Sequence, residues 1–261
     1  MLRELYTAAL GMLPRQARLE VVANNLANLS TLGYKRVALF QHALIEAQQN
    51  LSHVPGDAEL EDTPVSTYTD FAAGPLQKTG NPLDIALEGP GFFVVQDALG
   101  QLFLTRRGRF LLQPDGTVTT IDGKAVLGVG GAPLQLPLAT LTSVEVSTSQ
   151  NLASLLSVTP EGELRYRSLP VGTFWIVQPP LEALQRHDGV EFAVESGTPL
   201  QSLLPGQYRL LQGFVEGSNV NPVSELVQLI ELQRQFELGQ RVVRTNDATL
   251  ERSIEIARFV P

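Results

Sequence analysis

The chain has 261 residues, a hydrophobic share of 43% and a formal net charge of -8; this is enough apolar material for one large or two modest domains, and too much for a wholly disordered chain. The charge is uneven, with +3 on residues 1–36, -10 on residues 37–221 and -1 on residues 222–261. An acidic middle argues against nucleic acid as the main partner, and the absence of cysteine excludes disulfides and thiolate chemistry.

The first predicted element is a helix within residues 1–36. Its apolar positions follow the three- and four-residue spacing of a heptad seam, which is typical of helices packed on other helices; they are Leu2, Leu5, Ala9, Met12, Leu19, Ala23 and Leu26. Pro14 predicts a kink or a helix start, because proline removes a backbone hydrogen bond inside a helix. Gly33 predicts the helix end. No cleavable signal and no membrane-spanning stretch are expected from the sequence.

Three asparagines, Asn24, Asn25 and Asn28, lie near the end of this predicted helix. Asparagine is a poor helix former at exposed positions, so these amides need a specific role. One interpretation is that they fix register and partner choice beside the seam. The other is that they serve a frayed helix end and the turn that follows it.

Residues 37–66 are predicted to connect this helix to a β-rich domain over residues 67–214. The polar, Pro- and Gly-bearing stretch at about 50–64 is typical of a mobile connector. Beyond it the hydrophobic period changes to two and tight turns recur, which predicts mostly antiparallel strands. The predicted strands are 92–96, 101–105, 117–121, 124–127, 144–147, 164–168, 173–177, 190–194 and 208–215.

Residues 215–261 form the second predicted helical segment. Asn221 can cap the helix and Pro222 suits its first position. A helix from there to about Phe259 would be on the order of 55 Å long at 1.5 Å per residue. The three- and four-residue spacing returns here at Leu229, Leu232, Phe236, Gly239, Val243, Asn246, Leu250 and Ala257.

The expected fold class is α+β. Long N- and C-terminal helices pair as a coiled-coil-like helical layer, and a mainly antiparallel β domain forms the middle. An apolar seam on one helix needs a partner, because such helices gain most of their stability from packing. The alternative is an ordinary two-helix cover on the core of the β domain.

Three separated motifs resemble the bacterial flagellar rod and hook family. The first joins residues 23–28 to Thr31-Leu32-Gly33-Tyr34-Lys35-Arg36, and the last comprises residues 216–223 with Gln233-Arg234 and Phe236-Glu237. The middle motif comprises residues 79–89, Gly91-Phe92-Phe93 and residues 105–110. Their order matches the family, of which the chain resembles the proximal or distal rod type.

The resemblance implies a structural rod subunit that assembles through its terminal helices into the axial tube that transmits motor torque. The expected partners are copies of itself, other rod and hook subunits and the flagellar export apparatus, with peptidoglycan or surrounding ring proteins as further candidates. The expected location is the basal-body rod where it crosses the periplasm. The expected assembly residues are Leu5, Ala9, Met12, Leu19, Ala23, Asn24, Asn25, Leu26, Asn28, Gly33, Ser218, Asn219, Asn221, Leu229, Leu232, Gln233, Phe236, Val243 and Leu250.

Two other classes of function are weighed against this. An enzyme needs a positioned nucleophile, base or metal, but the three histidines (His42, His53 and His187) show no ligand spacing, and no catalytic, cofactor or metal residues are predicted. Residues 106–109, Arg-Arg-Gly-Arg, could meet an anionic cell-wall polymer, or simply form a solvated sheet edge. A β-rich cell-envelope binding module without polymerisation is the alternative function, although it gives the heptad seams no role.

Overall fold

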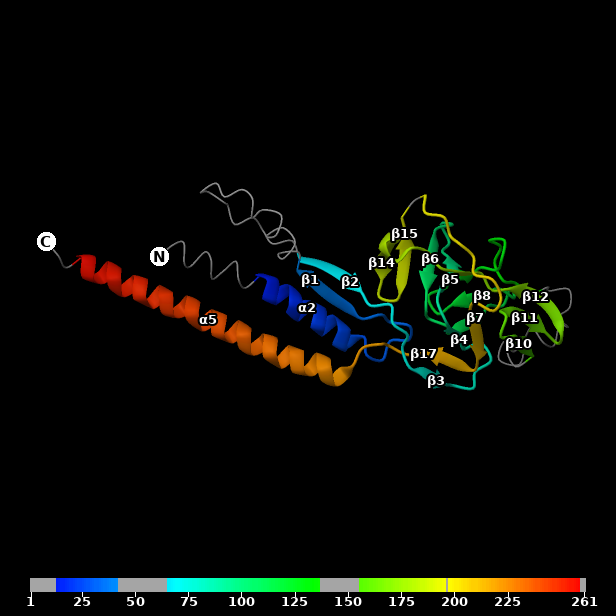
Figure 1. Cartoon of the computed structure of the whole chain (residues 1–261), viewed down its shortest axis with the longest axis horizontal. Coiled ribbons are helices and arrows are strands. Elements are labelled where there is room, and N and C mark those ends of the chain that lie inside the picture. Colours follow the sequence, from blue (N-terminus) through cyan, green and yellow to red (C-terminus); the bar gives the residue numbers. More distant parts are fainter. Residues whose placement is uncertain (1–12, 42–64, 137–154, 196, 259–261) are drawn as a thin grey trace. The chain divides into compact units, whose positions relative to one another are not determined.

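The structure is a computed structural model that describes residues 13–41, 65–136, 155–195 and 197–258. The chain forms two compact units, and it passes between them four times (Figure 1). The helical unit comprises the described parts of Met1–Leu29, Arg36–Phe71 and Val220–Pro261. The β unit comprises Ser30–Lys35 and the described parts of Ala72–Asn219.

The part of the helical unit that the structure describes holds two helices and a two-stranded ribbon. Helix α2 spans Leu13–Ala27 and helix α5 spans Pro222–Arg258. Strands β1 (Val37–Gln41) and β2 (Val65–Thr69) pair antiparallel. An isolated two-stranded ribbon is marginally stable in water, and here β1 packs on α2, which also contacts α5.

The start of α5 is fixed by its capping residue, as the sequence predicts. The side-chain oxygen of Asn221 accepts hydrogen bonds from the backbone N–H groups of Val223 at 3.0 Å and Ser224 at 3.3 Å. Pro222 occupies the first helical position, where its missing N–H has no intrahelical partner to lose. The helix therefore begins at a defined residue.

The prediction of two long terminal helices paired as a coiled-coil-like layer is wrong. The described residues hold one short N-terminal helix of 15 residues and one C-terminal helix of 37 residues. Helix α2 ends at Ala27, before Gly33, and the buried residues among its described side chains are Val22 and Asn25 rather than the predicted seam. The physical reason is that α2 packs on strand β1 as well as on α5, so a single seam does not describe its contacts.

The described residues of the β unit form four antiparallel sheets. The largest has the order β14-β15-β6-β5-β9-β8-β7, with β13 also paired to β5. Its strands are β5 (Phe92–Gln96), β6 (Leu102–Thr105), β7 (Phe110–Leu112), β8 (Val118–Thr120), β9 (Ala125–Val126), β13 (Ile176–Val177), β14 (Leu184–Asp188) and β15 (Glu191–Val194).

The smaller sheets complete this unit. Strands β10 (Leu156–Val158), β11 (Glu163–Tyr166) and β12 (Leu169–Thr173) form a three-stranded sheet. Strand β16 (Arg209–Gln212) pairs with β4 (Ile85–Glu88), and β17 (Phe214–Glu216) pairs with β3 (Leu76–Lys78). A short 3-10 helix, η3 (Leu181–Ala183), precedes β14.

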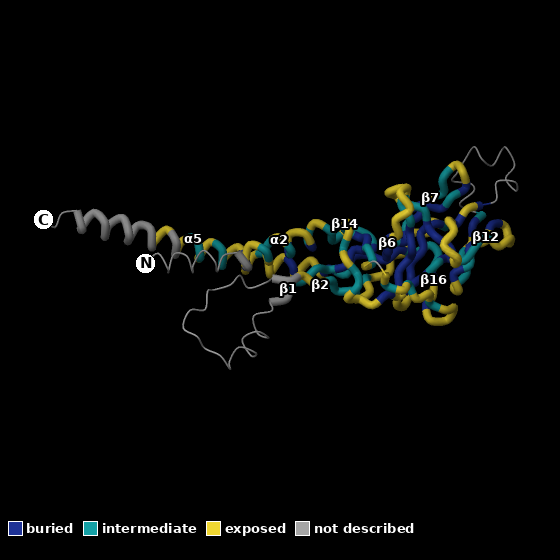
Figure 2. Tube along the Cα trace, turned by 90° about the horizontal axis from the view of Figure 1, so that it is seen from above, coloured by how far each residue is buried: buried dark blue, intermediate teal, exposed yellow. Residues whose placement is uncertain are grey.

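The buried core of the β unit contains a cluster of aromatic rings among aliphatic side chains. The ring of Phe93 packs edge-on against Phe110 at 5.2 Å and Phe174 at 5.9 Å between centroids, an arrangement that adds to plain area burial. Figure 2 shows buried residues gathered in the β unit, whereas the helices carry mostly intermediate and exposed residues. The two units thus differ in how completely each encloses an apolar core.

Individual strand predictions agree with the structure to different degrees. The prediction for 92–96 is confirmed without a shift by β5. The single strand predicted at 208–215 is wrong, because Gly213 takes a φ of 78° and divides it into β16 and β17. The prediction at 144–147 and the stretch at about 50–64 lie outside the described residues.

Candidate assembly site

A buried carboxylate organises the helical unit. Glu225, in the first turns of α5, is fully buried, and its Oε1 accepts a hydrogen bond from Arg36 Nε at 2.6 Å. The Arg36 side chain is 26% exposed. The amide of Asn25 lies 3.5 Å from the other oxygen of Glu225. One residue of α5 therefore holds two side chains from the N-terminal part of the chain.

The side chain of Asn25 hydrogen-bonds to the backbone of strand β1, as a neighbouring strand would. Its Nδ2 donates to the carbonyl oxygen of Val37 at 2.8 Å, and its Oδ1 accepts from the N–H of the same residue at 3.0 Å. Buried backbone groups need partners, and this amide supplies both. Asn24 and Asn28 instead bond to each other across the helix end, with Asn28 Nδ2 2.9 Å from the Asn24 carbonyl oxygen.

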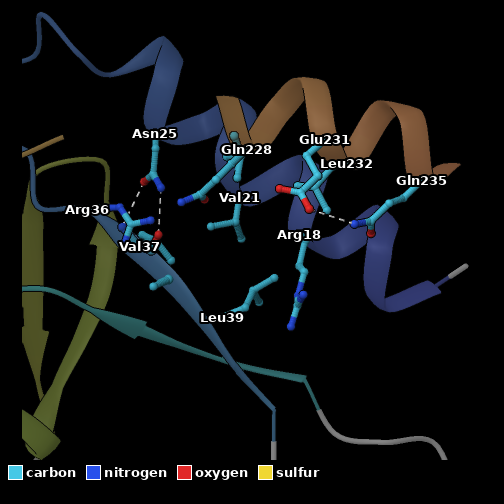
Figure 3. Close-up of a pocket in the computed structure, with 12 residues that line it drawn as sticks. Arg18, Val21, Asn25, Arg36, Val37, Leu39, Gln228, Glu231, Leu232 and Gln235 are labelled. Carbon is cyan, nitrogen blue, oxygen red and sulfur yellow. Dashed lines mark hydrogen bonds between the residues drawn. The ribbon is translucent and has the colours of Figure 1, made fainter. Parts of the chain in front are cut away.

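A groove of about 280 Å³ opens beside this buried carboxylate, between α2, β1 and α5 (Figure 3). Its apolar wall consists of Val21, Val22, Val37, Ala38, Leu39 and Leu232. Its polar members are Arg18, Asn25, Arg36, Gln228, Glu231 and Gln235. Glu231 and Gln235 bond to each other at 3.4 Å along the α5 side.

A second hollow, of about 350 Å³, lies where α2 meets the ribbon. It shares Val21, Val37 and Leu39 with the groove, and Thr67 of β2 contributes on the other side. Protein interiors are normally close-packed. The contact between α2 and β1 is therefore flanked by unfilled space on two sides, unlike the core of the β unit.

Helix α5 also carries an exposed apolar ridge. Val223, Leu226, Val227 and Ile230 are between 45% and 69% exposed, and their spacing places them on one helix face. The only charged residue between Pro222 and Ile230 is Glu225, which is buried. Exposed apolar residues that gather in this way commonly mark an interaction surface.

The β unit contains a comparable ion pair. Lys35 and Glu216 each have a side chain that is 1% exposed, and Nζ lies 2.6 Å from Oε1. Lys35 also donates to the carbonyl oxygen of Ala72 at 2.8 Å, and Oε1 of Glu216 accepts from the N–H of Gly74 at 2.9 Å. Such bonds are what a buried ion pair needs to offset its desolvation.

Arg106 completes this cluster. Its Nη1 lies 3.6 Å from Glu216 Oε2, and its two terminal nitrogens donate to the carbonyl oxygens of Leu87 and Gly89. Burial lowers the pKa of the Arg106 guanidinium, and the negative charge of Glu216 opposes that shift. Two buried cations thus share one carboxylate, and backbone carbonyl groups accept from the two terminal nitrogens of Arg106, while Arg106 Nε and Glu216 Oε2 have no hydrogen-bond partner among the described residues.

The stretch Ser30–Lys35 fits closely into the β unit. Gly33 has a φ of 70°, and a Cβ there would lie 2.6 Å from the backbone nitrogen of Arg107. The next residue, Tyr34, is buried, and the guanidinium of Arg186 lies over its ring at 4.9 Å. Burial lowers the pKa of Arg186, while the interaction with Tyr34 raises it. Gly33 is therefore required for close approach.

The other arginines of the 106–109 stretch have acidic partners. Arg107 Nη1 lies 2.7 Å from Asp122 Oδ2, and Arg109 Nη2 lies 3.4 Å from Asp84 Oδ2. These charges are therefore compensated within the chain. Among the described residues, no group of three or more His, Cys, Asp or Glu side chains could hold a metal ion.

The predicted assembly residues fall in both units. Asn25 and Leu232 are buried, Leu19, Leu26, Asn28, Leu229 and Phe236 are half-buried, and Ala23, Asn24, Asn221 and Gln233 are exposed. Gly33, Ser218 and Asn219 belong to the β unit. Val243 and Leu250 lie in α5, but their side chains are outside the description, as are Leu5, Ala9 and Met12 altogether.

The sequence predictions did not include the two buried carboxylates and their cations. One sequence feature could have indicated Glu225, since it is the single acidic residue in the mainly apolar run Val223-Ser224-Glu225-Leu226-Val227. Lys35 and Arg36 were part of a recognised motif, but nothing in their spacing indicates that each pairs with a different glutamate. In the described helices, no stretch combines the length and apolarity needed to cross a membrane.

Three family models match the chain in order. Residues 5–35 match the model described as flagella basal body rod protein, and residues 86–166 match flagellar hook protein FlgE/F/G D1 domain. Residues 211–256 match flagellar basal body rod FlgEFG protein C-terminal. The first and last ranges contain Asn25 and Glu225 respectively, and the middle range contains Arg106.

Whole-chain relatives carry the same names. The chain is 30% identical to a flagellar basal-body rod protein FlgG of Buchnera aphidicola subsp. Schizaphis graminum, covering 97% of this chain and 98% of the relative. It is also 30% identical to a FlgF of Mesorhizobium japonicum, covering 96% of each, and 31% identical to a FlgF of Caulobacter vibrioides, covering 95% of each. Relatives with both names therefore match to a similar degree.

Proposed function

Because the chain belongs to the flagellar basal-body rod protein family, we propose that its helical unit is the part through which it joins neighbouring subunits. The chain is a structural protein of the flagellar basal body, not an enzyme, and it assembles with other rod and hook subunits. The relatives do not favour the alternative of a cell-envelope binding module that does not polymerise.

The observation that carries this proposal is the apolar ridge on α5. Four large apolar side chains exposed on two consecutive turns, with no exposed charge among them, are costly on a surface that stays in water. A neighbouring subunit that covers the ridge removes this cost. The predicted assembly residues that lie on the helices, including Leu19, Ala23, Gln233 and Phe236, extend the proposed contact along both of them.

The β unit differs from the helical unit in having a large buried core of its own, and we propose a different role for it. Its aromatic core is closed, and several surface cations already have acidic partners. We propose that peptidoglycan or a surrounding ring is its candidate neighbour. Export by the flagellar secretion apparatus and a position within the periplasm are further parts of this proposal, which the family resemblance supports.

A complementation experiment tests the proposal. A strain that lacks this chain receives either the wild-type gene or the variant Val227→Glu, and basal bodies are isolated and probed for the chain. Because a buried charge is costly at an apolar contact, the variant is expected to be depleted from basal bodies and to give little motility.

The matched control is Leu99→Glu, which adds the same charge at a position that is 85% exposed in the β unit. It is expected to assemble like the wild type. Incorporation of Val227→Glu at the wild-type level would contradict the proposed role of the ridge. Failure of the wild-type chain itself to appear in basal bodies would contradict the proposed function as a whole.

A further inference from the structure

The groove and the ridge lie on different faces of the same helix. The α5 residues that line the groove are Gln228 and the residues three, four and seven positions after it, which are Glu231, Leu232 and Gln235. The ridge residues Val223, Leu226, Val227 and Ile230 have the same spacing, displaced by five positions. A displacement of five residues corresponds to a rotation of roughly 140° about the helix axis. One chain therefore cannot place its own ridge in its own groove.

We propose that the groove between α2, β1 and α5 receives the α5 ridge of a second copy of this chain. This inference rests on the proposed function and identifies the surfaces through which it operates. A contact between two different faces is heterologous, and repeating it generates an open, helical assembly rather than a closed dimer. The two faces needed for such a contact are both present in the helical unit.

The ridge and one wall of the groove are both apolar. The ridge presents only uncharged side chains over its two turns, and the inner wall of the groove is apolar at Val21, Val22, Ala38, Leu39 and Leu232. Arg36, one of the two arginines that line the groove, already has Glu225 as its partner. Docking on the apolar wall therefore removes apolar surface from water without breaking this buried pair.

The packing of the helical unit also favours an occupant. Val21, Val37 and Leu39 border unfilled space on both sides of the α2–β1 contact. Apolar side chains inserted there gain contacts that the isolated unit lacks. Arg234 and Glu237, which follow the ridge on α5, are exposed, so the apolar contact has a charged border of the kind seen at interface rims.

The absence of cysteine from the chain permits a direct test by cross-linking. One cysteine is placed in the groove by Ala38→Cys and one on the ridge by Val227→Cys, and basal bodies from cells making the double variant are oxidised. The expected result is a ladder of disulfide-linked copies on a non-reducing gel. Each single variant should give no ladder, and the control pair Ala38→Cys with Leu99→Cys should give none either.

Gln235→Cys combined with Val227→Cys provides a second groove position if Ala38→Cys lowers the amount of folded chain. In the purified monomer, Ala38→Cys should react with a small maleimide, because the proposed occupant comes from another copy. Protection of this thiol in the monomer would show that the chain's own residues fill the groove and would overturn the proposal.

Two other outcomes would also overturn it. Dimers formed by Val227→Cys alone would show that the ridge pairs with itself. Basal bodies that contain the double variant at the wild-type level without any ladder would show that the groove receives something other than the ridge. Either result would be compatible with the proposed function. Absence of the wild-type chain from basal bodies would instead contradict both the proposed function and the contact between groove and ridge.

Discussion

Each of the two units contains an ion pair between a buried glutamate and a basic residue. In the β unit Glu216 holds Lys35, and in the helical unit Glu225 holds the next residue, Arg36, each at 2.6 Å. Both side chains of the β-unit pair are 1% exposed, whereas the helical unit places its pair beside an open groove that Arg36 helps to line. The helical unit therefore differs from the β unit in carrying exposed apolar residues on one face of a helix together with a groove, although single exposed apolar residues such as Leu99 and Leu204 occur in the β unit too.

The largest effect is expected at Glu216. Glu216→Gln leaves Lys35 buried without its counter-charge, and breaking one side of a buried ion pair typically costs about 3–5 kcal/mol. Denaturant unfolding of the full chain measures this loss. The double variant Lys35→Met/Glu216→Gln should recover part of it. A loss of unfolding free energy below about 1 kcal/mol, typical of exposed pairs, would contradict the cost expected for breaking the buried Lys35–Glu216 pair.

The second-largest loss of unfolding free energy is expected at Gly33, because the β unit leaves no room for a side chain there. Gly33→Ala combines a positive φ, which costs of order 1–3 kcal/mol for a residue other than glycine, with a clash against the backbone of Arg107. Gly123→Ala is the matched control, since Gly123 has a φ of 82° but a Cβ added there would meet no atom within 4 Å. Equal losses of unfolding free energy would contradict the close approach.

A smaller loss is expected at Glu225. Arg36 is 26% exposed, so water can partly replace the carboxylate after Glu225→Gln, and removing a hydrogen bond to a charged group costs about 1.5–3 kcal/mol. Hydrogen exchange should become faster at the Val37 amide, whose N–H donates to Asn25. Unchanged protection at that amide would show that Glu225 does not hold Asn25 in place. A loss larger than that of Glu216→Gln would reverse the comparison.

The smallest effect concerns alkaline pH in the β unit. Burial raises the pKa of Tyr208, and the charge of Glu161 adds to the shift. The phenol therefore stabilises the native state fully below its usual pKa of about 10, and that contribution is lost as the pH rises through the raised value. Tyr208→Phe should flatten this loss in unfolding measured from pH 8 to 11. An unchanged slope would assign the alkaline loss to other groups.

The sequence predicted those features that depend on local periodicity and capping. The strand at Phe92–Gln96 and the start of α5 at Asn221-Pro222 follow from residue patterns alone. The split at Gly213 was missed, because an alternating pattern continues on both sides of one residue with positive φ. The strand β4, Ile85–Glu88, was missed because three of its four residues are buried and do not alternate.

The candidate site was only partly predictable for a physical reason. Asn25 was singled out because asparagine is poor helix chemistry, and the structure shows it bonded to both backbone groups of Val37. Its other partner, Glu225, is 200 positions away. Pairings over such separations depend on the whole fold, so neither periodicity nor composition indicates which acid meets which cation.

The route of the chain has a practical consequence for anyone who wishes to express part of it. Because the chain changes unit at residues 29/30, 35/36, 71/72 and 219/220, a recombinant fragment cut at 72 and 219 would omit Ser30–Lys35. Such a fragment would keep Glu216 but lose its lysine, and would lose the tyrosine ring that lies beneath Arg186. A tethered peptide that carries residues 30–35 is therefore the minimal addition needed for an excised β unit to retain its native contacts.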